Sequence, residues 1–117
     1  MNAAAKSVYY FGIYLFLLSA VLITYPNLLL TTFQIAETNE VWIRVVGVLV
    51  FSLGIYYVYM AITNHTFFMM ITVYVRSSIL LWFIGFVIAG FAPVQLILFG
   101  VIDFAAAMWT LYELKKN

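Results

Sequence analysis

Long apolar runs separated by short polar interruptions make up almost the whole chain. The runs lack the polar–apolar alternation that a membrane barrel strand shows over about ten positions. Backbone inside a bilayer must satisfy its own hydrogen bonds, so only helices or a closed barrel can cross it. Because these runs are apolar on every side, the pattern predicts an all-α fold, an integral membrane four-helix bundle with antiparallel up-down topology and short loops.

The polar interruptions divide the chain into four segments of the length that a membrane span needs, about 20 residues. Pro26 ends the first segment, residues 37–40 form the most polar stretch, and residues 63–66 and 91–93 are typical of tight turns. We therefore expect one transmembrane domain over residues 1–117, with spans at about 8–25, 41–62, 67–90 and 94–112. This arrangement leaves no room for a separate soluble domain.

Two apolar stretches need a separate interpretation. The run from Val8 to Tyr25 lacks a clear small-x-small cleavage site and three further runs follow it, which favours a retained span over a secretory signal. Residues 28–35 are apolar but too short to cross a bilayer. They predict either an interfacial turn of helix or an extension of the first span.

Composition supports lipid as the main solvent of the chain. Of its 117 residues, 68% are hydrophobic and 8% are charged, with a mean hydropathy of +1.14. A soluble domain is about half apolar and a quarter charged, and a small one buries only part of its surface. The net charge of +1 is too small to suggest binding to nucleic acid. The absence of cysteine excludes disulfides and thiol chemistry.

The few charged residues outside the apolar runs predict an orientation. Four crossings place both termini on one side, where Lys6, Lys115 and Lys116 lie, whereas Glu37 and Glu40 lie on the other. Basic residues are enriched on the cytoplasmic side of membrane proteins. We therefore expect an integral membrane protein with both termini in the cytoplasm.

Small residues at helical spacing predict the faces on which the helices pack, because small side chains let backbones approach closely in lipid. They are Gly47, Gly54 and Ala61 in the second span, Ser78, Gly85 and Ala92 in the third, and Gly100, Ala107 and Thr110 in the fourth. Membrane lipid is the expected partner. Because the same faces also suit contact with a second protomer, a homo-oligomer or a larger membrane protein complex is a further possibility.

Two charges lie inside predicted spans. Arg76 and Asp103 are each nine residues into the third and fourth spans, from opposite sides, or about 13 Å deep at 1.5 Å per residue. Spans joined by a very short turn are neighbours. An unpaired charge at this depth costs at least about 3 kcal/mol. We therefore expect the two side chains to meet near the middle of the bundle.

The pair has two interpretations of about equal weight. It is either a fixed ion pair that sets the helix register, or part of a polar pocket for a ligand headgroup or of a path for protons or ions. Thr72 shares a face with Arg76, roughly opposite to the small residues. This predicts a third span with protein on two sides, either at the centre of the bundle or at an oligomer seam. Arg44, one turn inside the second span, is interpreted as an interfacial anchor or a partner of Glu40, with an inward position as the alternative.

No motif points to catalysis. The chain has no Gly-rich phosphate loop, no G-x-S-x-G elbow and no paired carboxylates in one span. Its one histidine, His65, lies in a turn without the partners that a metal site needs. We therefore expect no cofactor and no metal, and nothing in the sequence argues for an enzyme.

Trp42-Ile43-Arg44-Val45-Val46-Gly47, followed by Gly54 and by Asp103 in the last span, resembles the small bacterial four-helix membrane proteins grouped as DoxX-like. The resemblance covers the whole chain and implies the four-helix architecture. Many members of the group have no assigned activity, so the resemblance implies none. Small multidrug transporters have a similar size but carry a glutamate in the first helix, and residues 8–25 contain no acid.

Two functional hypotheses follow. The first is a non-enzymatic inner-membrane protein, either an accessory or scaffold bundle or one that holds a lipid-like ligand, with Arg76 and Asp103 buried as a pair. The alternative is a small transporter or channel that uses these two residues at the membrane midplane. A membrane enzyme that acts on a lipid has the least support.

Overall fold

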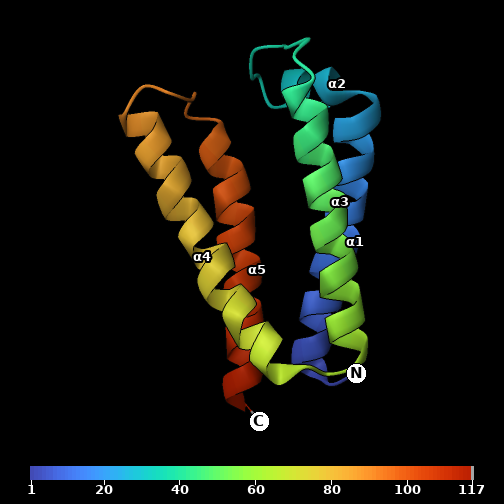
Figure 1. Cartoon of the computed structure of the whole chain (residues 1–117). Helices are drawn as coiled ribbons and strands as arrows, with labels where there is room; N and C mark the ends of the chain where they lie inside the picture. Colours follow the sequence, from blue (N-terminus) through green and yellow to red (C-terminus); the bar gives the residue numbers. More distant parts are fainter. Residues whose placement is uncertain (117) are drawn as a thin grey trace.

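The computed structural model describes residues 1–116, and these are helical apart from short connections (Figure 1). Its elements are α1 (Ala3–Thr24), α2 (Pro26–Thr32), α3 (Trp42–Ile62), α4 (Thr66–Ile88) and α5 (Leu96–Lys116). All except α2 are long and apolar enough to cross a membrane. The prediction of an all-α protein with four candidate spans is confirmed, and the short apolar stretch after Pro26 forms a helix of its own.

Local chemistry explains where the helices begin and end. The side-chain oxygen of Asn2 accepts a hydrogen bond from the backbone N–H of Ala5 at 2.8 Å, so α1 begins five residues before the predicted span. Pro26 lacks the N–H that would continue α1, and instead occupies the first turn of α2. Nδ1 of His65 caps α4 by accepting from the N–H of Phe68 at 3.2 Å.

Three helix ends share one stop signal. Gln34, Asn64 and Gly90 have φ values of +60°, +53° and +83° and follow α2, α3 and α4. The N–H of each bonds the carbonyl three residues earlier, and the N–H of the next residue bonds the carbonyl five residues before it. This is the Schellman arrangement, in which a left-handed residue lets the chain satisfy the last carbonyls of a helix.

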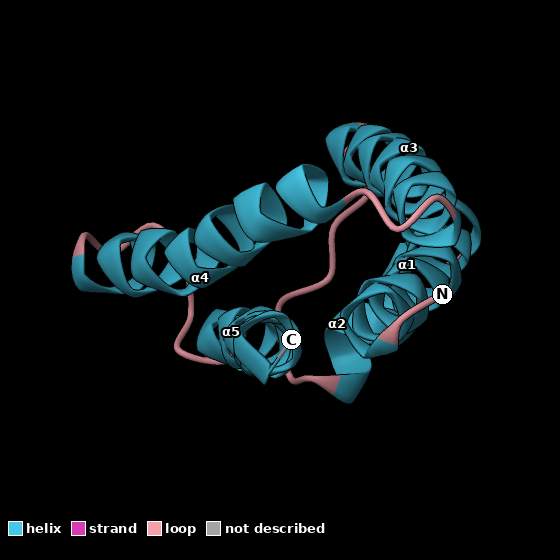
Figure 2. Ribbon diagram, turned by 90° about the horizontal axis from the view of Figure 1, so that it is seen from below, coloured by secondary structure: helices cyan, strands magenta, loops and turns pink. Residues whose placement is uncertain are grey.

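The long helices form two pairs. α1 packs along α3, α4 packs along α5, and the pairs meet mainly where α1 contacts α5. The pairs converge at the end that carries both termini and diverge toward the opposite end, where the connections 33–41 and 89–95 lie (Figures 1 and 2). α4 is not central within the chain, because it packs chiefly on α5 and α1 is the helix that reaches both pairs. Its other predicted position, at an oligomer seam, stays a prediction.

The core lies at the end of the molecule where the pairs converge. Its buried apolar side chains come from α1, α3 and α4 and are those of Ala4, Ala5, Val8, Phe11, Leu15, Tyr57, Ala61 and Met69. Elsewhere the helices expose many large apolar side chains, as expected for surfaces that face lipid.

Glycines mark where the helices of each pair approach most closely. A Cβ at Gly54 would lie 3.0 Å from the ring of Phe16, and one at Gly47 would lie 2.8 Å from Cγ1 of Ile23, so both face α1. A Cβ at Gly100 would lie 3.0 Å from Cα of Leu80 on α4. Gly85 differs, because it is exposed and a Cβ there would meet no atom within 4 Å. The structure therefore does not show the predicted packing contact at Gly85.

Candidate functional site

The guanidinium of Arg76 is the most deeply buried charge that the structure describes, with 2% of the residue exposed. Its Nε donates to the backbone carbonyl of Thr72 at 3.2 Å, and its Nη2 donates to the Thr72 hydroxyl at 3.0 Å. Nη2 also donates to the hydroxyl of Thr110 on α5 at 2.9 Å. The structure therefore places the predicted neighbour Thr72 directly against Arg76.

Two aromatic rings from the other helix pair surround the same guanidinium. Its central carbon lies 4.9 Å from the ring centroid of Phe11 on α1 and 5.6 Å from that of Tyr57 on α3. Cation–π attraction is strongest where water is excluded, as it is here. Arg76 thus contacts all three of the other long helices, and it stabilises the junction between the two pairs.

Hydroxyl groups extend this polar contact into α1. Oγ1 of Thr110 and Oγ of Ser7 lie 2.6 Å apart, and the Ser7 hydroxyl also donates to the carbonyl of Ala4 at 2.7 Å. The Thr110 hydroxyl also lies 3.2 Å from the carbonyl of Ala106, one turn earlier on α5, and either hydroxyl of the Ser7–Thr110 pair can be the donor between them. Polar contacts therefore run from Arg76 through Thr110 and Ser7 to the backbone of α1.

Asp103 does not bond to Arg76. The hydrogen bonds of Arg76 go to Thr72 and Thr110, and among residues 1–116 the predicted direct ion pair is absent. The half-buried carboxyl of Asp103 still faces the interior, within coulombic range of Arg76 and of the hydroxyls of Tyr14 and Tyr57. The two charges attract each other across a gap and are not in contact.

One donor of the site is left without a partner. Nη1 of Arg76 is buried and has no hydrogen-bond partner in the described chain. An unpaired buried N–H of a charged group is costly, about 1–3 kcal/mol or more, and native structures rarely leave one unsatisfied. Nη1, which carries two N–H groups, is therefore able to donate to a ligand oxygen.

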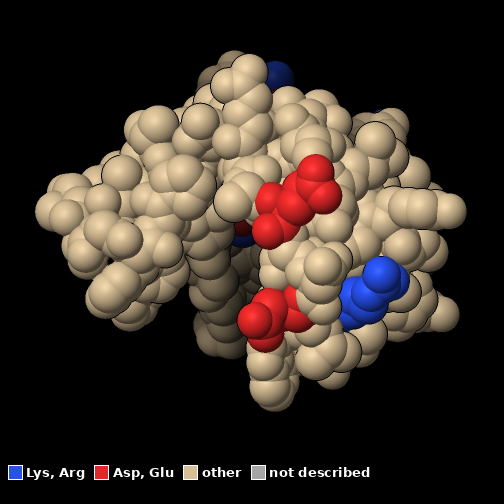
Figure 3. All heavy atoms as spheres, turned by 90° about the horizontal axis from the view of Figure 1, so that it is seen from above, with Lys and Arg blue, Asp and Glu red and all other residues tan. Residues whose placement is uncertain are grey.

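The end of the molecule opposite the termini is hollowed between the two helix pairs. Figure 3 shows this hollow from above, with acidic side chains at its edge and charged atoms visible within it. Glu37 and Glu40, both exposed, belong to this end of the chain. A separate apolar groove of about 220 Å³ lies between α1, α2 and α5 and includes Tyr14, Phe33, Phe99 and Ile102 in its lining.

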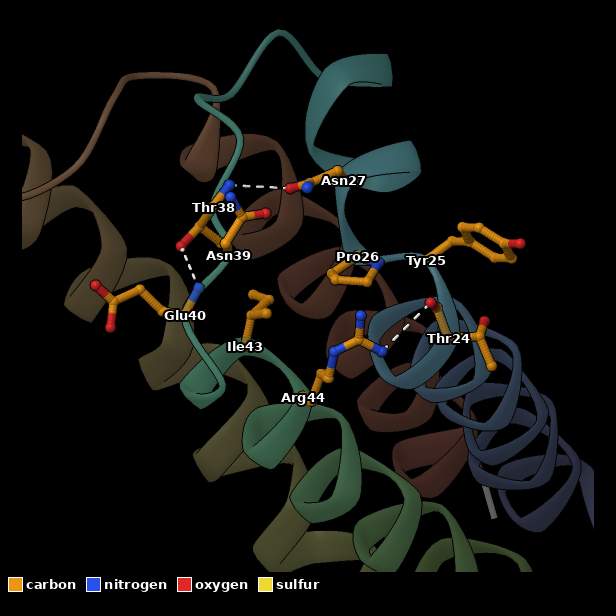
Figure 4. Close-up of a pocket in the computed structure, with 9 residues that line it drawn as sticks. All are labelled: Thr24, Tyr25, Pro26, Asn27, Thr38, Asn39, Glu40, Ile43 and Arg44. Carbon is orange, nitrogen blue, oxygen red and sulfur yellow. Dashed lines mark hydrogen bonds between the residues drawn. The ribbon is translucent and has the colours of Figure 1, made fainter.

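Arg44, the other arginine that the sequence singled out, lies apart from this site. It is exposed, and its Nη1 donates to the carbonyl of Ile23 and, at 3.3 Å, to that of Thr24 at the end of α1 (Figure 4). Within the described chain it makes no bond to Glu40. A cation beside the last carbonyls of a helix is favourable, because those carbonyls carry its partial negative charge.

The remaining packing candidates have different surroundings. Gly47, Gly54, Gly100 and Ala107 are buried at contacts between helices. Gly85 instead belongs to an open apolar groove of about 530 Å³ on the outer side of α4, beside Trp82 and Phe86. Within residues 1–116 no three His, Asp or Glu side chains come together as a metal site.

Four contributors to the Arg76 site were not identified from the sequence as polar or aromatic partners: Ser7, Phe11, Tyr57 and Thr110. Thr110 carried a signal, because it shares a helical face with Gly100, Asp103 and Ala107. The other three depend on which helices are neighbours, which hydropathy does not reveal. No family model, curated protein or solved structure matches the chain.

Proposed function

We propose that this chain is an integral membrane protein that binds a lipid-like ligand between its two helix pairs. In this proposal α1, α3, α4 and α5 cross the bacterial inner membrane in antiparallel up-down order with both termini cytoplasmic. Four helices of spanning length support the crossings, and the common end of the termini carries Lys6, Lys115 and Lys116 (Figure 1).

The observation that carries this proposal is the separation of Arg76 from Asp103. Both are ionisable groups inside candidate spans, where such groups are functional by default. Nη1 of Arg76 has no hydrogen-bond partner in the described chain, and the hydrogen bonds of Nε and Nη2 go to Thr72 and Thr110, not to Asp103. A headgroup with one acceptor and one donor would bridge the two charges, accepting from Arg76 and donating to Asp103.

The apolar part of the ligand has a suitable surface nearby. The groove between α1, α2 and α5 is lined almost wholly by apolar side chains, and two of them, Phe99 and Ile102, lie four residues and one residue before Asp103 on α5. Apolar pockets with a few convergent polar groups are the usual form of a small-molecule site. An acyl or isoprenoid chain fits this description, with its polar end directed to Asp103.

Native mass spectrometry of gently extracted protein tests this proposal. We expect the wild-type chain to retain a small amphipathic molecule, and Asp103→Asn to lose most of it while its circular dichroism stays unchanged. Ser78→Ala, on the outer side of α4, serves as the control and should retain the ligand. The proposal is wrong if the wild-type chain carries no such molecule and takes up none from added lipid extract, or if Asp103→Asn binds as well as wild type.

A small transporter or channel is the second candidate, and one observation favours it. The carboxyl of Asp103 is half-buried inside a span without a hydrogen bond in the described chain, as a group that exchanges a proton would be. Proteoliposomes that contain a pH-sensitive dye would report proton movement. Flux that Asp103→Asn abolishes would support transport, and wild-type vesicles as tight as empty ones would reject proton transport.

A further inference from the structure

A second polar pocket lies far from Arg76, at the junction of α1, α2 and α3. It has a volume of about 210 Å³, and Arg44, Asn27 and Asn39 are among its lining residues (Figure 4). It lies at the end of the molecule opposite the termini, whereas the hydrogen bonds of Arg76 reach Ser7 and Thr110 near the terminal end. A ligand in this pocket is therefore independent of the function proposed above.

The guanidinium of Arg44 is held in place by the broken end of α1. α1 ends at Thr24, so no continuing helix supplies N–H groups to its last carbonyls, and Nη1 of Arg44 donates to those of Ile23 and Thr24. Figure 4 shows the other terminal nitrogen turned toward the pocket. Because these bonds already hold the guanidinium in place, the Arg44 side chain loses little further conformational entropy when a ligand binds its other terminal nitrogen.

Two amides add donors to the same space. Oδ1 of Asn27 accepts from the backbone N–H of Thr38 at 2.9 Å, which leaves the Nδ2 protons of Asn27 for a ligand. The side chain of Asn39 makes no hydrogen bond in the described chain and points toward the pocket, whereas the carboxylate of Glu40 points away (Figure 4). Figure 4 draws the amide oxygen of Asn39 toward the pocket, so this amide presents its Nδ2 to a ligand after it turns over. In that orientation amide donors surround one positive charge.

The position of the pocket fits the headgroup level of a bilayer. Tyr25, which lines the pocket, and Trp42, which precedes the lining residue Ile43, are 73% and 68% exposed. Exposed tyrosine and tryptophan at the ends of spans are typical of the membrane–water interface. On α3, the exposed side chains of Val48 and Phe51 continue from Arg44 toward the middle of the span and offer a surface for an acyl chain.

We propose that this pocket binds a phosphate group through Arg44, Asn27 and Asn39. Planar guanidinium groups bind phosphate oxygens with two parallel hydrogen bonds, and amide donors complete the shell. A phospholipid headgroup and free inorganic phosphate both present this chemistry. The surrounding aromatic and apolar surface favours the lipid.

The experiment titrates purified protein in detergent with dioctanoyl phosphatidylglycerol, and follows binding by native mass spectrometry and by the fluorescence of the tryptophans. Dioctanoylglycerol, which lacks the phosphate, should not bind at the same concentrations. Competition by millimolar inorganic phosphate would assign the site to the free anion, and its failure to compete would assign it to the lipid. Equal binding of both lipids would overturn the proposal.

Variants locate the site without disturbing the fold. Asn39→Asp places a negative charge against the phosphate and should weaken binding about tenfold, and Asn39→Ala about threefold, in line with the usual strength of charge-assisted and neutral hydrogen bonds. Gln95→Ala removes an amide from the other connection at the same end and should bind as wild type does. Wild-type affinity in Asn39→Asp, or an equal loss in Gln95→Ala, would contradict the proposed location.

Arg44→Gln provides an independent check, because it removes the charge that the proposal requires. It also removes the hydrogen bonds to the end of α1, so its thermal unfolding is measured alongside binding. At a temperature where the variant remains folded, we expect binding to fall more than tenfold, since a charged hydrogen bond contributes more than a neutral one. Undiminished binding in the folded variant would overturn the proposal.

Discussion

Thr110 accepts a hydrogen bond from Nη2 of Arg76 at 2.9 Å, and the same hydroxyl lies 2.6 Å from that of Ser7. The first contact joins α5 to α4, and the second joins α5 to α1. One threonine hydroxyl therefore connects three helices at the end where the two pairs converge. The stability of this junction should depend on the hydroxyl more than on the size of the side chain.

Thr110→Val tests this dependence, because valine keeps the shape of threonine but removes the hydroxyl. The change leaves Nη2 of Arg76 and the Ser7 hydroxyl short of a partner, and we expect it to lower the free energy of unfolding by about 1–3 kcal/mol. Thermal unfolding in detergent micelles, followed by circular dichroism, measures the loss. Thr32→Val, at the exposed end of α2, is the matched control, and an equal effect there would show that the buried contact has no special role.

Arg76→Lys should also destabilise the protein although it keeps the charge. An ammonium group cannot donate to Thr72 and Thr110 in the fixed geometry of a guanidinium, nor stack its plane between Phe11 and Tyr57. We expect a loss of about 2 kcal/mol in the free energy of unfolding, the usual size for a broken buried charged contact. Arg44→Lys, at an exposed site, should cost less, and the reverse order would contradict this account.

Double-mutant cycles distinguish the bonded partner of Arg76 from its distant one. Residues in contact couple by about 0.5–3 kcal/mol, whereas separated residues contribute nearly independently. We expect the cycle of Arg76→Gln with Thr110→Val to show coupling in this range, and the cycle with Asp103→Asn to show less. Strong coupling to Asp103 and none to Thr110 would indicate a direct ion pair in the membrane.

We expect replacement by alanine to have opposite effects on stability at Gly100 and at Gly85. A Cβ at Gly100 would lie 3.0 Å from the backbone Cα of Leu80, which cannot move without separating α4 from α5, so we expect a loss of about 1–3 kcal/mol. Gly85→Ala meets open space and should be neutral or slightly stabilising, since alanine favours helix. Unfolding of both variants by denaturant in micelles measures the difference. Equal destabilisation would mean that Gly85 packs against another protomer.

The sequence predicted the helices well because hydropathy and turn residues are local signals. Pro26, the polar stretch near Glu37 and the turn at Asn64 each lie at a boundary that the structure shows. The start of α1 was placed too late, because the cap supplied by Asn2 extends the helix through residues that are not strongly apolar.

The site was harder to predict because side-chain direction matters as much as depth. Side chains on a helix lean toward its N-terminus. Arg76 leans toward Thr72, four residues before it on α4, and reaches Thr110, seven residues beyond Asp103 on α5. Its hydrogen bonds therefore hold the guanidinium against Thr72 and Thr110 and not against the Asp103 carboxyl. A threonine four residues before an arginine was the more informative signal.

The unequal spacing of the two helix pairs has a consequence for the surrounding bilayer. A body that is narrow at one end and splayed at the other displaces more lipid from one leaflet than from its counterpart (Figures 1 and 2). In a bilayer, acyl chains beside the wide end would have to spread sideways to fill the space between α3 and α4. The protein, inserted as proposed, would have its lowest insertion free energy in a curved membrane, with its broad end on the convex surface.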